Sequence, residues 1–353
     1  MNPADRTSRT ATANGESYGR SLLNRVRTPG SDGDSRLTHV AELPARAGRV
    51  GEWPVWVRQE VITAFAAIGI DAPWSHQAST AETAASGQHV VVATGTASGK
   101  SLGYQLPVLS GLLDDPTATA LYIAPTKALG ADQLRMIGEL THEGPLRDIH
   151  AATYDGDTPG EIRQWVRANA RWIFTNPDML HVGMLRSHKR WARVLRRLRY
   201  VVVDECHAYR GVFGSHVALV LRRLRRLATH YGADPVFVLC SATTADPAEA
   251  ASRLVGAPCV AVTEDGSPHG ARTVALWEPP LSTAVTGENG APGGPGGHSA
   301  GARVNGAQGG EGIFFPPGRG APSRWLVGFL FGVGVWGGVW GVYFVFFGGP
   351  HPV

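Results

Sequence analysis

The sequence predicts an α/β fold, with a mainly parallel sheet covered by helices on both faces. Short apolar runs rich in Val and Ile alternate with stretches of helical periodicity along the middle of the chain. Strands that are apolar on both faces must be buried on both sides, as in parallel sheets. The predicted strands are 90–92, 120–124, 149–153, 172–175, 200–204, 236–240 and 259–262. Ligands of such sheets bind at the carboxyl ends of the strands, so the residues after each run are the first site candidates.

Helical patterns separate these runs. Apolar residues recur at helical spacing over 53–68, where Gly69 ends the pattern, and a second helix is expected over 78–86. The later helical candidates are 127–140, 159–168, 178–185, 214–230 and 247–254. Residues 1–48 are polar and poor in aromatic side chains, which predicts a disordered leader. We therefore expect the folded domain to span 49–282.

Composition narrows the class of protein only slightly. The chain has 353 residues and a formal charge of +4, a mildly basic balance that permits a nucleic-acid partner without demonstrating one. Its cysteines, Cys206, Cys240 and Cys259, are widely spaced, so neither a disulfide framework nor a metal cluster is expected. The N-terminus carries no apolar segment of the secretory type. These features favour a cytoplasmic protein.

A phosphate-binding turn is predicted directly after the first strand. Residues 92–101 read Val-Ala-Thr-Gly-Thr-Ala-Ser-Gly-Lys-Ser and lead into a helical stretch. In a strand–turn–helix, backbone N–H groups converge at the positive end of the helix, which suits phosphate. Lys100 would reach the β- and γ-phosphates, and Ser101 would offer its hydroxyl to magnesium. The nucleotide-binding candidates here are Thr94, Gly95, Thr96, Ala97, Ser98, Gly99, Lys100 and Ser101.

This turn departs from the strict pattern G-x-x-x-x-G-K-[ST], which asks for glycine where the chain has Thr94. The alternative is a surface turn rich in Gly, Ser and Thr. Gly95 and Gly99 still supply conformational freedom, and strand, turn, Gly-Lys-Ser and helix follow in the required order. The order favours the phosphate site.

A glutamine precedes the turn. Gln77 closes the segment Pro-Trp-Ser-His-Gln at 73–77, and its amide can donate to and accept from an adenine edge at once. Taken alone, a surface or capping role is the better interpretation. Only its position before the phosphate turn favours base recognition.

The strand 200–204 stops abruptly in charged residues. Asp204, Glu205 and His207 follow three consecutive valines. Asp204 would hold magnesium through water, and Glu205 would orient and deprotonate the water that attacks the γ-phosphate. His207 is a candidate to contact the γ-phosphate or the next motif. An isolated Asp-Glu pair would favour a plain charged turn, but a magnesium-triphosphate site needs both these carboxylates and Lys100.

Taken together, these motifs resemble the first motor domain of superfamily-two DEAD/DEAH-type helicases. The matching segments are Gln77, Thr-Ala-Ser-Gly-Lys-Ser (96–101), Ala-Pro-Thr-Lys-Ala-Leu (124–129), Thr-Asn-Pro-Asp-Met-Leu (175–180), Asp-Glu-Cys-His (204–207) and Ser-Ala-Thr (241–243). The stretch 204–218 is similar to bacterial DNA-repair helicases of the MrfA/YprA/SftH type. The resemblance covers about 53–291 and implies a RecA-like P-loop NTPase fold, ATP and Mg²⁺ as ligands, and unwinding of DNA in the 3′ to 5′ direction.

The resemblance also implies contacts with the backbone of one DNA strand. The residues it assigns are Pro125, Thr126, Lys127, Thr175, Asn176 and Pro177 for the strand, with Ser241 and Thr243 for coupling. Without the resemblance, ordinary helix capping explains the Pro-Thr and Asn-Pro steps equally well. Basic clusters at 186–199 and 222–226 have a solvated helix face as their default interpretation and accessory DNA contact as the alternative.

The chain departs from this family after Gly290. No second RecA-like domain follows; 283–324 reads as a Gly/Pro-rich linker, and 325–349 is an uncharged run with eight glycines and nine aromatics. That run is long enough for a transmembrane helix, although so many glycines weaken a helix. The preferred hypothesis is out-of-frame translation or a misassembled gene end, because 285–353 contains no lysine.

Three functions remain open at this point. The first and preferred one is an ATP-dependent DNA helicase represented by its ATP-binding half. The second is an ATP- and nucleic-acid-binding module with little turnover, because an arginine from a second domain normally completes such a site. The third is a membrane-anchored ATP-binding protein.

Overall fold

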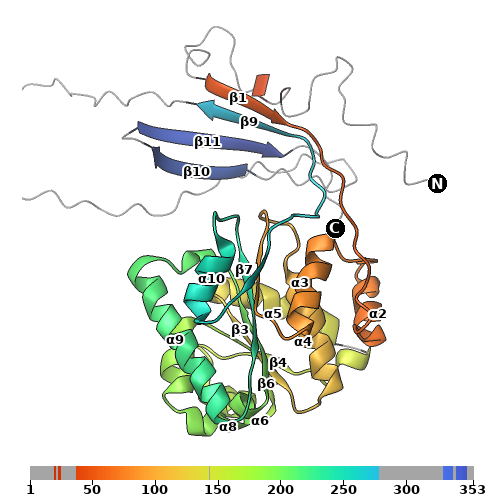
Figure 1. The fold of residues 1–353 in the computed structure, drawn as a ribbon, viewed down its shortest axis with the longest axis vertical. Helices are drawn as coiled ribbons and strands as arrows, with labels where there is room; N and C mark the ends of the chain where they lie inside the picture. Colours follow the sequence, from red (N-terminus) through yellow and green to blue (C-terminus); the bar gives the residue numbers. More distant parts are fainter. Residues whose placement is uncertain are drawn as a thin grey trace, which may run out of the picture. The chain divides into compact units, whose positions relative to one another are not determined.

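The computed structural model describes residue 20 and residues 23–24, 37–142, 144–277, 329–336 and 339–347. The chain forms two units: one comprises residues 46–269, and the other joins the segments 1–45 and 270–352. A seven-stranded sheet belongs to the first unit and a four-stranded sheet to the second (Figure 1). The candidate site residues all lie in the first unit.

The seven-stranded sheet has the strand order β4-β5-β3-β6-β7-β2-β8, and every pair of neighbours is parallel. Its strands are β2 (Val90–Ala93), β3 (Thr119–Ile123), β4 (Ala151–Thr153), β5 (Trp172–Thr175), β6 (Leu198–Val203), β7 (Val236–Ser241) and β8 (Val260–Val262). All seven predicted strands are present, with ends shifted by at most two residues. The predicted parallel sheet is therefore confirmed.

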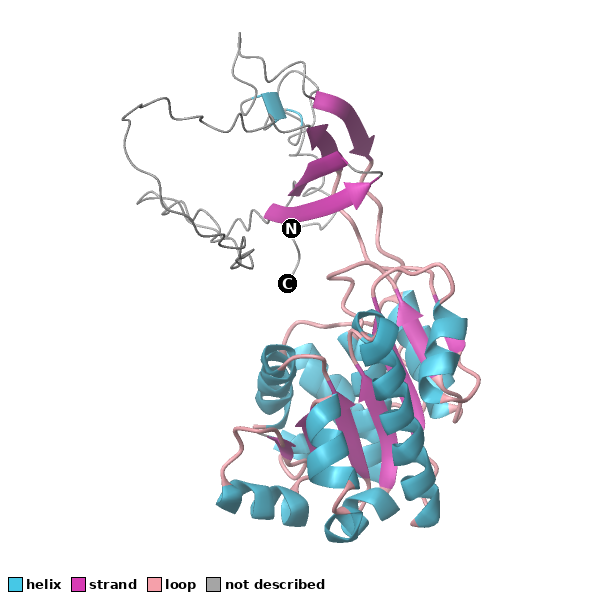
Figure 2. Ribbon diagram, turned by 90° about the vertical axis from the view of Figure 1, so that its left-hand side faces the viewer, coloured by secondary structure: helices cyan, strands magenta, loops and turns pink. Residues whose placement is uncertain are grey.

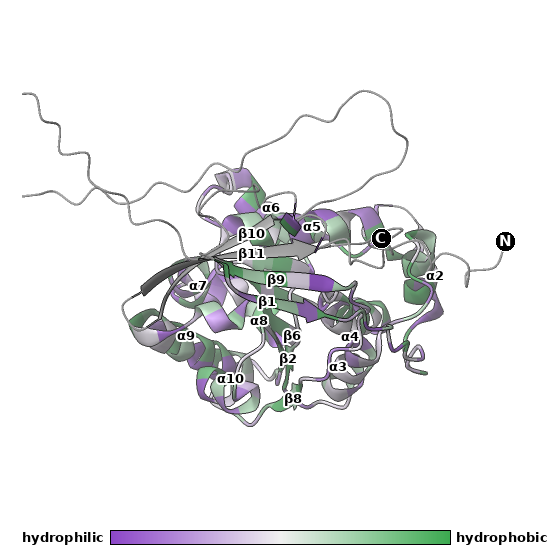
Figure 3. Ribbon diagram, turned by 90° about the horizontal axis from the view of Figure 1, so that it is seen from above, coloured by the Kyte–Doolittle hydropathy of each residue, from purple (hydrophilic) through white to green (hydrophobic). Residues whose placement is uncertain are grey.

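Two apolar cores lie on the two faces of this sheet. Successive strand residues alternate between them: Val201 and Val203 lie in one core, and Val202 lies in the other. The first core is covered by α6 (Gly160–Asn169), α8 (Ala192–Arg196), α9 (Gly211–His230) and α10 (Pro247–Val255). The second is covered by α2 (Gln59–Ala67), α3 (Ser75–Ala85), α4 (Ser101–Asp114) and α5 (Lys127–Thr141). The strands therefore lie between two helix layers (Figure 2), and the view from above shows apolar β2 and β6 between α9 and α4 (Figure 3).

Two predicted helices differ in detail from the structure. The pattern over 53–68 yields a helix only from Gln59, because Pro54 begins a turn in which its carbonyl accepts the Val57 N–H. The helix expected over 178–185 divides into α7 (Pro177–Met179) and a π-helix (Leu180–Leu185). There the carbonyl of Gly183 accepts hydrogen bonds from two side chains, Ser187 Oγ and Trp191 Nε1.

The prediction of a disordered leader was wrong for its last part. Residues Leu37–Leu43 form β1, which pairs antiparallel with β9 (Arg272–Trp277), so that Val40 lies opposite Ala275. The partner strand lies far away in the sequence, and the short segment LTHVAEL carries too little regular alternation to predict a strand by itself. Most of residues 1–36 lie outside the described part of the chain.

The transmembrane helix considered for 325–349 is also wrong. Within this run, β10 (Phe329–Trp336) and β11 (Val339–Phe347) pair antiparallel with each other, and β11 pairs with β9. Within the ranges that the structure describes, no helix has the length and apolar character needed to cross a bilayer. The predicted linker at 283–324 lies outside the described residues.

Candidate functional site

The candidate nucleotide residues gather at the carboxyl edge of the seven-stranded sheet. The phosphate turn follows β2, Asp204 follows β6, and Ser241 ends β7, the strand between those two. Ala93 lies opposite Ser241, and Val203 lies opposite Leu239, so β6 ends two residues before β2 and β7 at the same edge of the sheet. With neighbouring strands about 4.8 Å apart, the ends of β2 and β6 are separated by roughly 10 Å. The topology thus brings together the two halves of the predicted site.

The phosphate turn is held by its own side chains. Thr94 Oγ1 and Ser98 Oγ share a 2.7 Å hydrogen bond, and both residues are buried. Two residues adopt left-handed backbone, Ala97 with φ of 60° and Gly99 with φ of 74°. Thr94 does not adopt a left-handed backbone. Threonine therefore fits without strain at the position where the strict pattern has glycine.

Lys100 lies over this turn. Its ammonium donates hydrogen bonds to the carbonyls of Gly95, at 2.9 Å, and Thr94, at 3.3 Å. Ser101 is the first residue of α4, so the positive end of that helix lies at the turn. The arrangement presents a cation and backbone donors to the same concavity, as phosphate binding requires.

Gln77 connects the start of α3 to the phosphate turn. Its Oε1 accepts the Trp74 N–H at 2.7 Å, and its Nε2 donates to the Gly99 carbonyl at 2.7 Å. The side chain is buried. An amide offers two donors and two acceptor lone pairs, so one of each remains for a further partner. The capping interpretation therefore describes its present contacts, and base recognition remains a prediction.

Asp204 and Glu205 are fixed by backbone and by a buried phenol. Asp204 Oδ1 accepts the Glu205 N–H at 2.9 Å, while Tyr122 Oη donates to Asp204 Oδ2. Burial, together with the charge of Asp204, raises the pKa of Tyr122, so the phenol stays protonated as a donor. Glu205 adopts a left-handed backbone with φ of 46°, a strained conformation that is typical of functional sites.

His207 links the end of β6 to the end of β7. Its Nδ1 lies 3.1 Å from Glu205 Oε2 and 3.1 Å from the backbone nitrogen of Ala242. A single ring nitrogen cannot donate to the carboxylate and accept from the N–H at the same time, so the two contacts compete. The sequence predicted that His207 contacts the γ-phosphate or the next motif, and the structure gives it the contact with 241–243. In that motif Ser241 is buried and Thr243 is exposed.

The residues predicted to bind a DNA strand lie at the ends of β3 and β5, next to one another in the sheet. Thr126 Oγ1 accepts the Leu129 N–H and Asn176 Oδ1 accepts the Met179 N–H, so both side chains cap helices. Thr175 Oγ1 is buried and donates to the Tyr154 carbonyl. Pro125 is half-buried and Pro177 is buried at the first position of α7.

Lys127 is the exposed cation of this edge. The Asp157 carboxylate, on the turn after β4, forms an ion pair with it and raises the pKa of the lysine through a hydrogen bond. Capping and ion pairing thus account for the present contacts of Thr126, Asn176 and Lys127. Contact with DNA stays a prediction for all three.

Comparison with known proteins identifies this architecture. The model of the DEAD/DEAH box helicase family matches residues 74–251, half of the chain. The chain belongs to the DEAD/DEAH box helicases. The match begins just before Gln77 and ends beyond Ser241, so it includes the phosphate turn and both carboxylates.

Relatives of this DEAD/DEAH box chain include longer helicases. The ATP-dependent helicase YprA of Bacillus subtilis is 42% identical over 249 residues, which are 70% of this chain and 33% of that protein. The ATP-dependent helicase HRQ1 of Saccharomyces cerevisiae is 41% identical over 251 residues, 70% of this chain and 23% of that protein. The chain therefore spans a third or less of the length of these relatives.

Solved structures show the same fold. The crystal structure of the DUF1998 helicase MrfA bound to DNA and AMPPNP has a TM-score of 0.69 and 40% identity, covering 75% of this chain and 36% of that one. The DEAD-box helicase Mss116, at 17% identity and a TM-score of 0.52, shares the fold alone. The predicted RecA-like fold and the resemblance to MrfA/YprA-type helicases are confirmed.

Several arginines of the two basic clusters of this helicase chain have structural partners. Arg193 donates to the carbonyls of Arg167 and Ala170 at the end of α6, and Arg225 donates to Val255 and Gly256 at the end of α10. Cations at helix C-termini satisfy the last free carbonyls and the helix dipole. Leu221 and Leu224 are fully buried, as expected of core anchors. The sequence interpretations of a solvated face or a DNA contact missed this capping role.

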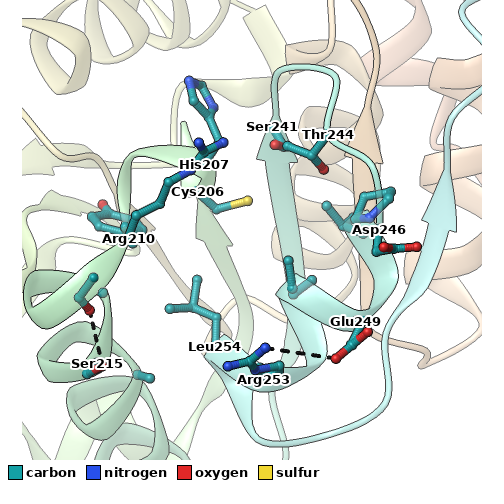
Figure 4. Close-up of a pocket in the computed structure, with 18 of the residues that line it drawn as sticks. Cys206, His207, Arg210, Ser215, Ser241, Thr244, Asp246, Glu249, Arg253 and Leu254 are labelled. Carbon is teal, nitrogen blue, oxygen red and sulfur yellow. Dashed lines mark hydrogen bonds and ion pairs between the residues drawn. The ribbon is translucent and has the colours of Figure 1, made fainter. Parts of the chain in front are cut away.

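A groove of about 780 Å³ lies beside the His207 contact in this helicase domain, between the start of α9 and α10 (Figure 4). Charges of both signs line it, including Arg210, Asp246 and an ion pair between Glu249 and Arg253 at 3.9 Å. His207 and Ser241 belong to its wall. The groove therefore adjoins the predicted coupling motif.

Sequence reasoning missed two residues that brace the helicase site. Tyr122 lies within an apolar strand, and nothing in its spacing indicates that its hydroxyl reaches Asp204 on the neighbouring strand. Asp265 follows β8 in an Asp-Gly-Ser turn, and its side chain is mostly buried beside the phosphate turn. A carboxylate just after a strand, at the same edge as the site, is the signal by which it could have been found.

Proposed function

We propose that this chain is the ATP-binding first motor domain of an ATP-dependent DNA helicase. The observation that carries the proposal is the meeting of strand ends: Lys100 after β2 and the Asp204–Glu205 pair after β6 lie at one edge of the sheet. The intervening strand, β7, ends in the motif that His207 contacts. The similarity to MrfA, solved with DNA and AMPPNP, supports both ligands.

Each residue of the proposed ATP site has a role that its contacts support. Lys100 exchanges its bonds to the Thr94 and Gly95 carbonyls for the terminal phosphates. Ser101 and Asp204 would hold Mg²⁺, which supplies neutralisation of phosphate charge. Glu205 accepts the proton of the attacking water, and His207 Nδ1, 3.1 Å from Glu205 Oε2, orients the carboxylate when that nitrogen carries a proton. The remaining turn residues, Gly95, Thr96, Ala97, Ser98 and Gly99, surround the phosphates with backbone donors.

Recognition of adenine is assigned to Gln77. Its unused donor and acceptor can pair with the base while its bonds to Trp74 and Gly99 keep the amide plane fixed. Binding of the base thereby acts directly on the phosphate turn.

We assign the edge formed by β3 and β5 to single-stranded DNA. Thr126 and Asn176 use their side-chain oxygens in capping, so the contacts with phosphates come from the helix N-termini that they cap and from Lys127. Pro125, Thr175 and Pro177 hold these loops in place. A 3′ to 5′ direction follows from the resemblance to the family and is part of the proposal.

A second candidate is a module that binds ATP and nucleic acid with little turnover. It is favoured because residues 46–269 form one motor unit and the chain spans a third or less of its helicase relatives. In phosphoryl transfer, an arginine supplied by another domain is worth on the order of 10³-fold or more in rate. The isolated chain then binds both ligands and hydrolyses slowly.

We also propose a cytoplasmic location. Cys206, Cys240 and Cys259 are free thiols, and burial raises the pKa of each, so they remain protonated. Unpaired buried thiols suit a reducing compartment.

DNA-stimulated ATP hydrolysis by the purified chain distinguishes the two candidates. Turnover that Glu205→Gln abolishes, while ATP binding persists, supports the helicase motor; binding without turnover supports the module. Glu139→Gln is the matched control, because Glu139 is exposed on α5 and pairs only with Arg135 among its described contacts. ATP binding that survives Lys100→Ala unchanged would contradict both.

A further inference from the structure

Three segments distant in sequence meet beside the phosphate turn. Residues 46–51 pair with residues 266–269 through backbone bonds between Arg46 and His269 and from Arg49 to Gly266. Residues 46–51 are also hydrogen-bonded to the start of α3. The Ser75 N–H donates to the Arg49 carbonyl, and the Gly51 N–H donates to the Pro73 carbonyl. The start of α3 carries Gln77, which holds Gly99. Residues 266–269 are thus linked by hydrogen bonds to residues 46–51, and residues 46–51 are linked to the helix that carries Gln77.

Asp265 is the charged centre of this meeting point. Its Oδ1 accepts the Ser267 N–H at 2.8 Å and the Ser267 hydroxyl at 2.7 Å. Its Oδ2 lies 3.0 Å from His269 Nε2 and 3.4 Å from Arg46 Nη2. Burial by itself would raise the pKa of Asp265, but the bonds from Ser267 and His269 lower it to about 2. The carboxylate is therefore ionised and its charge is balanced by neighbours.

The same carboxylate lies beside the phosphate turn. A Cβ placed on Gly95 would lie only 3.3 Å from Asp265 Oδ2, so the side chain fills the space beside that glycine. On the other side, the ring of His76 lies 3.9 Å from Asp265 Oδ1 and accepts the Gly266 N–H through Nδ1. His76 is fully buried and adjoins Gln77 in α3. Asp265 thus borders the turn at Gly95, and Gln77 holds it at Gly99.

We propose that Asp265 is a positioning residue of the phosphate turn, which it ties to the segment 264–269 where the chain leaves the motor unit. A phosphate site needs backbone N–H groups fixed before the ligand arrives, and packing by Asp265 limits the movement of Gly95. Arg46 and His269 pair with the Asp265 carboxylate. A phosphate bound at the turn therefore does not face an unpaired negative charge. The functional part of this inference rests on the proposed ATP site; the structural part does not.

Hydrogen exchange in the 353-residue chain tests the structural part directly. The variants are Asp265→Ala, which removes all contacts, and Asp265→Asn, which keeps the acceptor for Ser267. We expect exchange of the peptide 93–100 to accelerate about tenfold or more in Asp265→Ala and by less than about threefold in Asp265→Asn. The matched control is Glu264→Gln, since Glu264 is exposed and pairs with Arg49 at 3.1 Å; it leaves the peptide unchanged.

Binding of a fluorescent ATP analogue by the same variants tests the functional part. We expect Asp265→Ala to weaken binding about tenfold and Asp265→Asn to restore most of it. Unchanged exchange of 93–100 in a folded Asp265→Ala protein overturns the inference. If that variant does not fold, Asp265→Ser, whose shorter side chain cannot keep both the Ser267 and the His269 contacts, replaces it, and unchanged exchange of 93–100 in Asp265→Ser then overturns the inference. Altered exchange in a chain whose wild type binds no ATP rejects the proposed ATP site while retaining the positioning role.

Discussion

The side-chain amide of Gln77 donates a 2.7 Å hydrogen bond to the backbone oxygen of Gly99, the residue before Lys100. This bond joins α3 to the phosphate turn at a residue with left-handed backbone. Residues on α3 can therefore affect phosphate binding without contacting phosphate themselves.

Replacing Gln77 by alanine removes this bond and the bond to Trp74. We expect the affinity for an ATP analogue to fall about tenfold, because the Gly99 carbonyl and the Trp74 N–H both lose their side-chain partner. Titration with a fluorescent analogue measures it. Gln88→Ala, at an exposed position after the same helix, is the control. Equal affinities for the Gln77→Ala and Gln88→Ala proteins would refute the link.

Tyr122→Phe tests the support of Asp204. The phenol donates to Asp204 Oδ2, so its removal leaves the carboxylate with the Glu205 N–H as its remaining described hydrogen-bond donor. If Asp204 holds Mg²⁺, the concentration of Mg²⁺ needed for half-maximal ATP binding rises about tenfold. Tyr200→Phe, also buried, is the control on β6. A Mg²⁺ requirement that stays constant in Tyr122→Phe contradicts the assignment.

His207→Ala tests communication between the ends of β6 and β7. The variant loses the contacts with Glu205 and with the Ala242 N–H but keeps the phosphate turn intact. We expect ATP affinity to remain within about twofold and stimulation of hydrolysis by single-stranded DNA to fall at least tenfold. His216→Ala, exposed on α9, serves as the control. Full stimulation in His207→Ala would exclude the coupling role.

The sequence was sufficient to predict that the phosphate turn and the Asp204–Glu205 pair lie at one edge of the sheet. Each motif follows an apolar run, and the carboxyl ends of parallel strands meet at that edge. The roles of these residues in ATP binding stay predictions. Asp265 was missed because its partner Arg46 lies at the other end of the motor unit, so no local pattern reports the contact. The role of Arg193 was missed for a related reason. A basic residue in a helical pattern is normally assigned to solvent, and only the tertiary structure shows that Arg193 donates to the carbonyl at the end of α6.

We expect the free energy of unfolding to decrease as the pH falls below neutrality, because His89 takes up a proton more readily in the unfolded chain than in the folded one. Its Nδ1 accepts the Phe237 N–H at 3.1 Å, and burial, followed by the charge of Arg225, lowers its pKa. The unfolded chain then binds a proton below about pH 6.5 that the folded chain excludes, so the free energy of unfolding decreases as the pH falls, by at most about 1.4 kcal/mol per pH unit. Urea unfolding between pH 5 and 8 measures the slope. His89→Asn, whose Oδ1 can replace Nδ1 as acceptor, should flatten it, and an unchanged slope would assign the effect to other groups such as His76.

Arg193→Ala separates helix capping from DNA contact in the first basic cluster. The guanidinium donates to the Ala170 carbonyl at 2.7 Å and to the Arg167 carbonyl at 2.9 Å, and burial lowers its pKa. Because the side chain is partly exposed, loss of these charged hydrogen bonds should lower the free energy of unfolding by about 1–1.5 kcal/mol, less than for a buried group. Urea unfolding measures that change, and the salt dependence of DNA binding should stay the same because no phosphate contact is lost. Arg190→Ala, at an exposed position, should alter stability by less than about 0.5 kcal/mol. If Arg193→Ala instead preserves stability and reduces the salt slope by about one, Arg193 binds DNA rather than the end of α6.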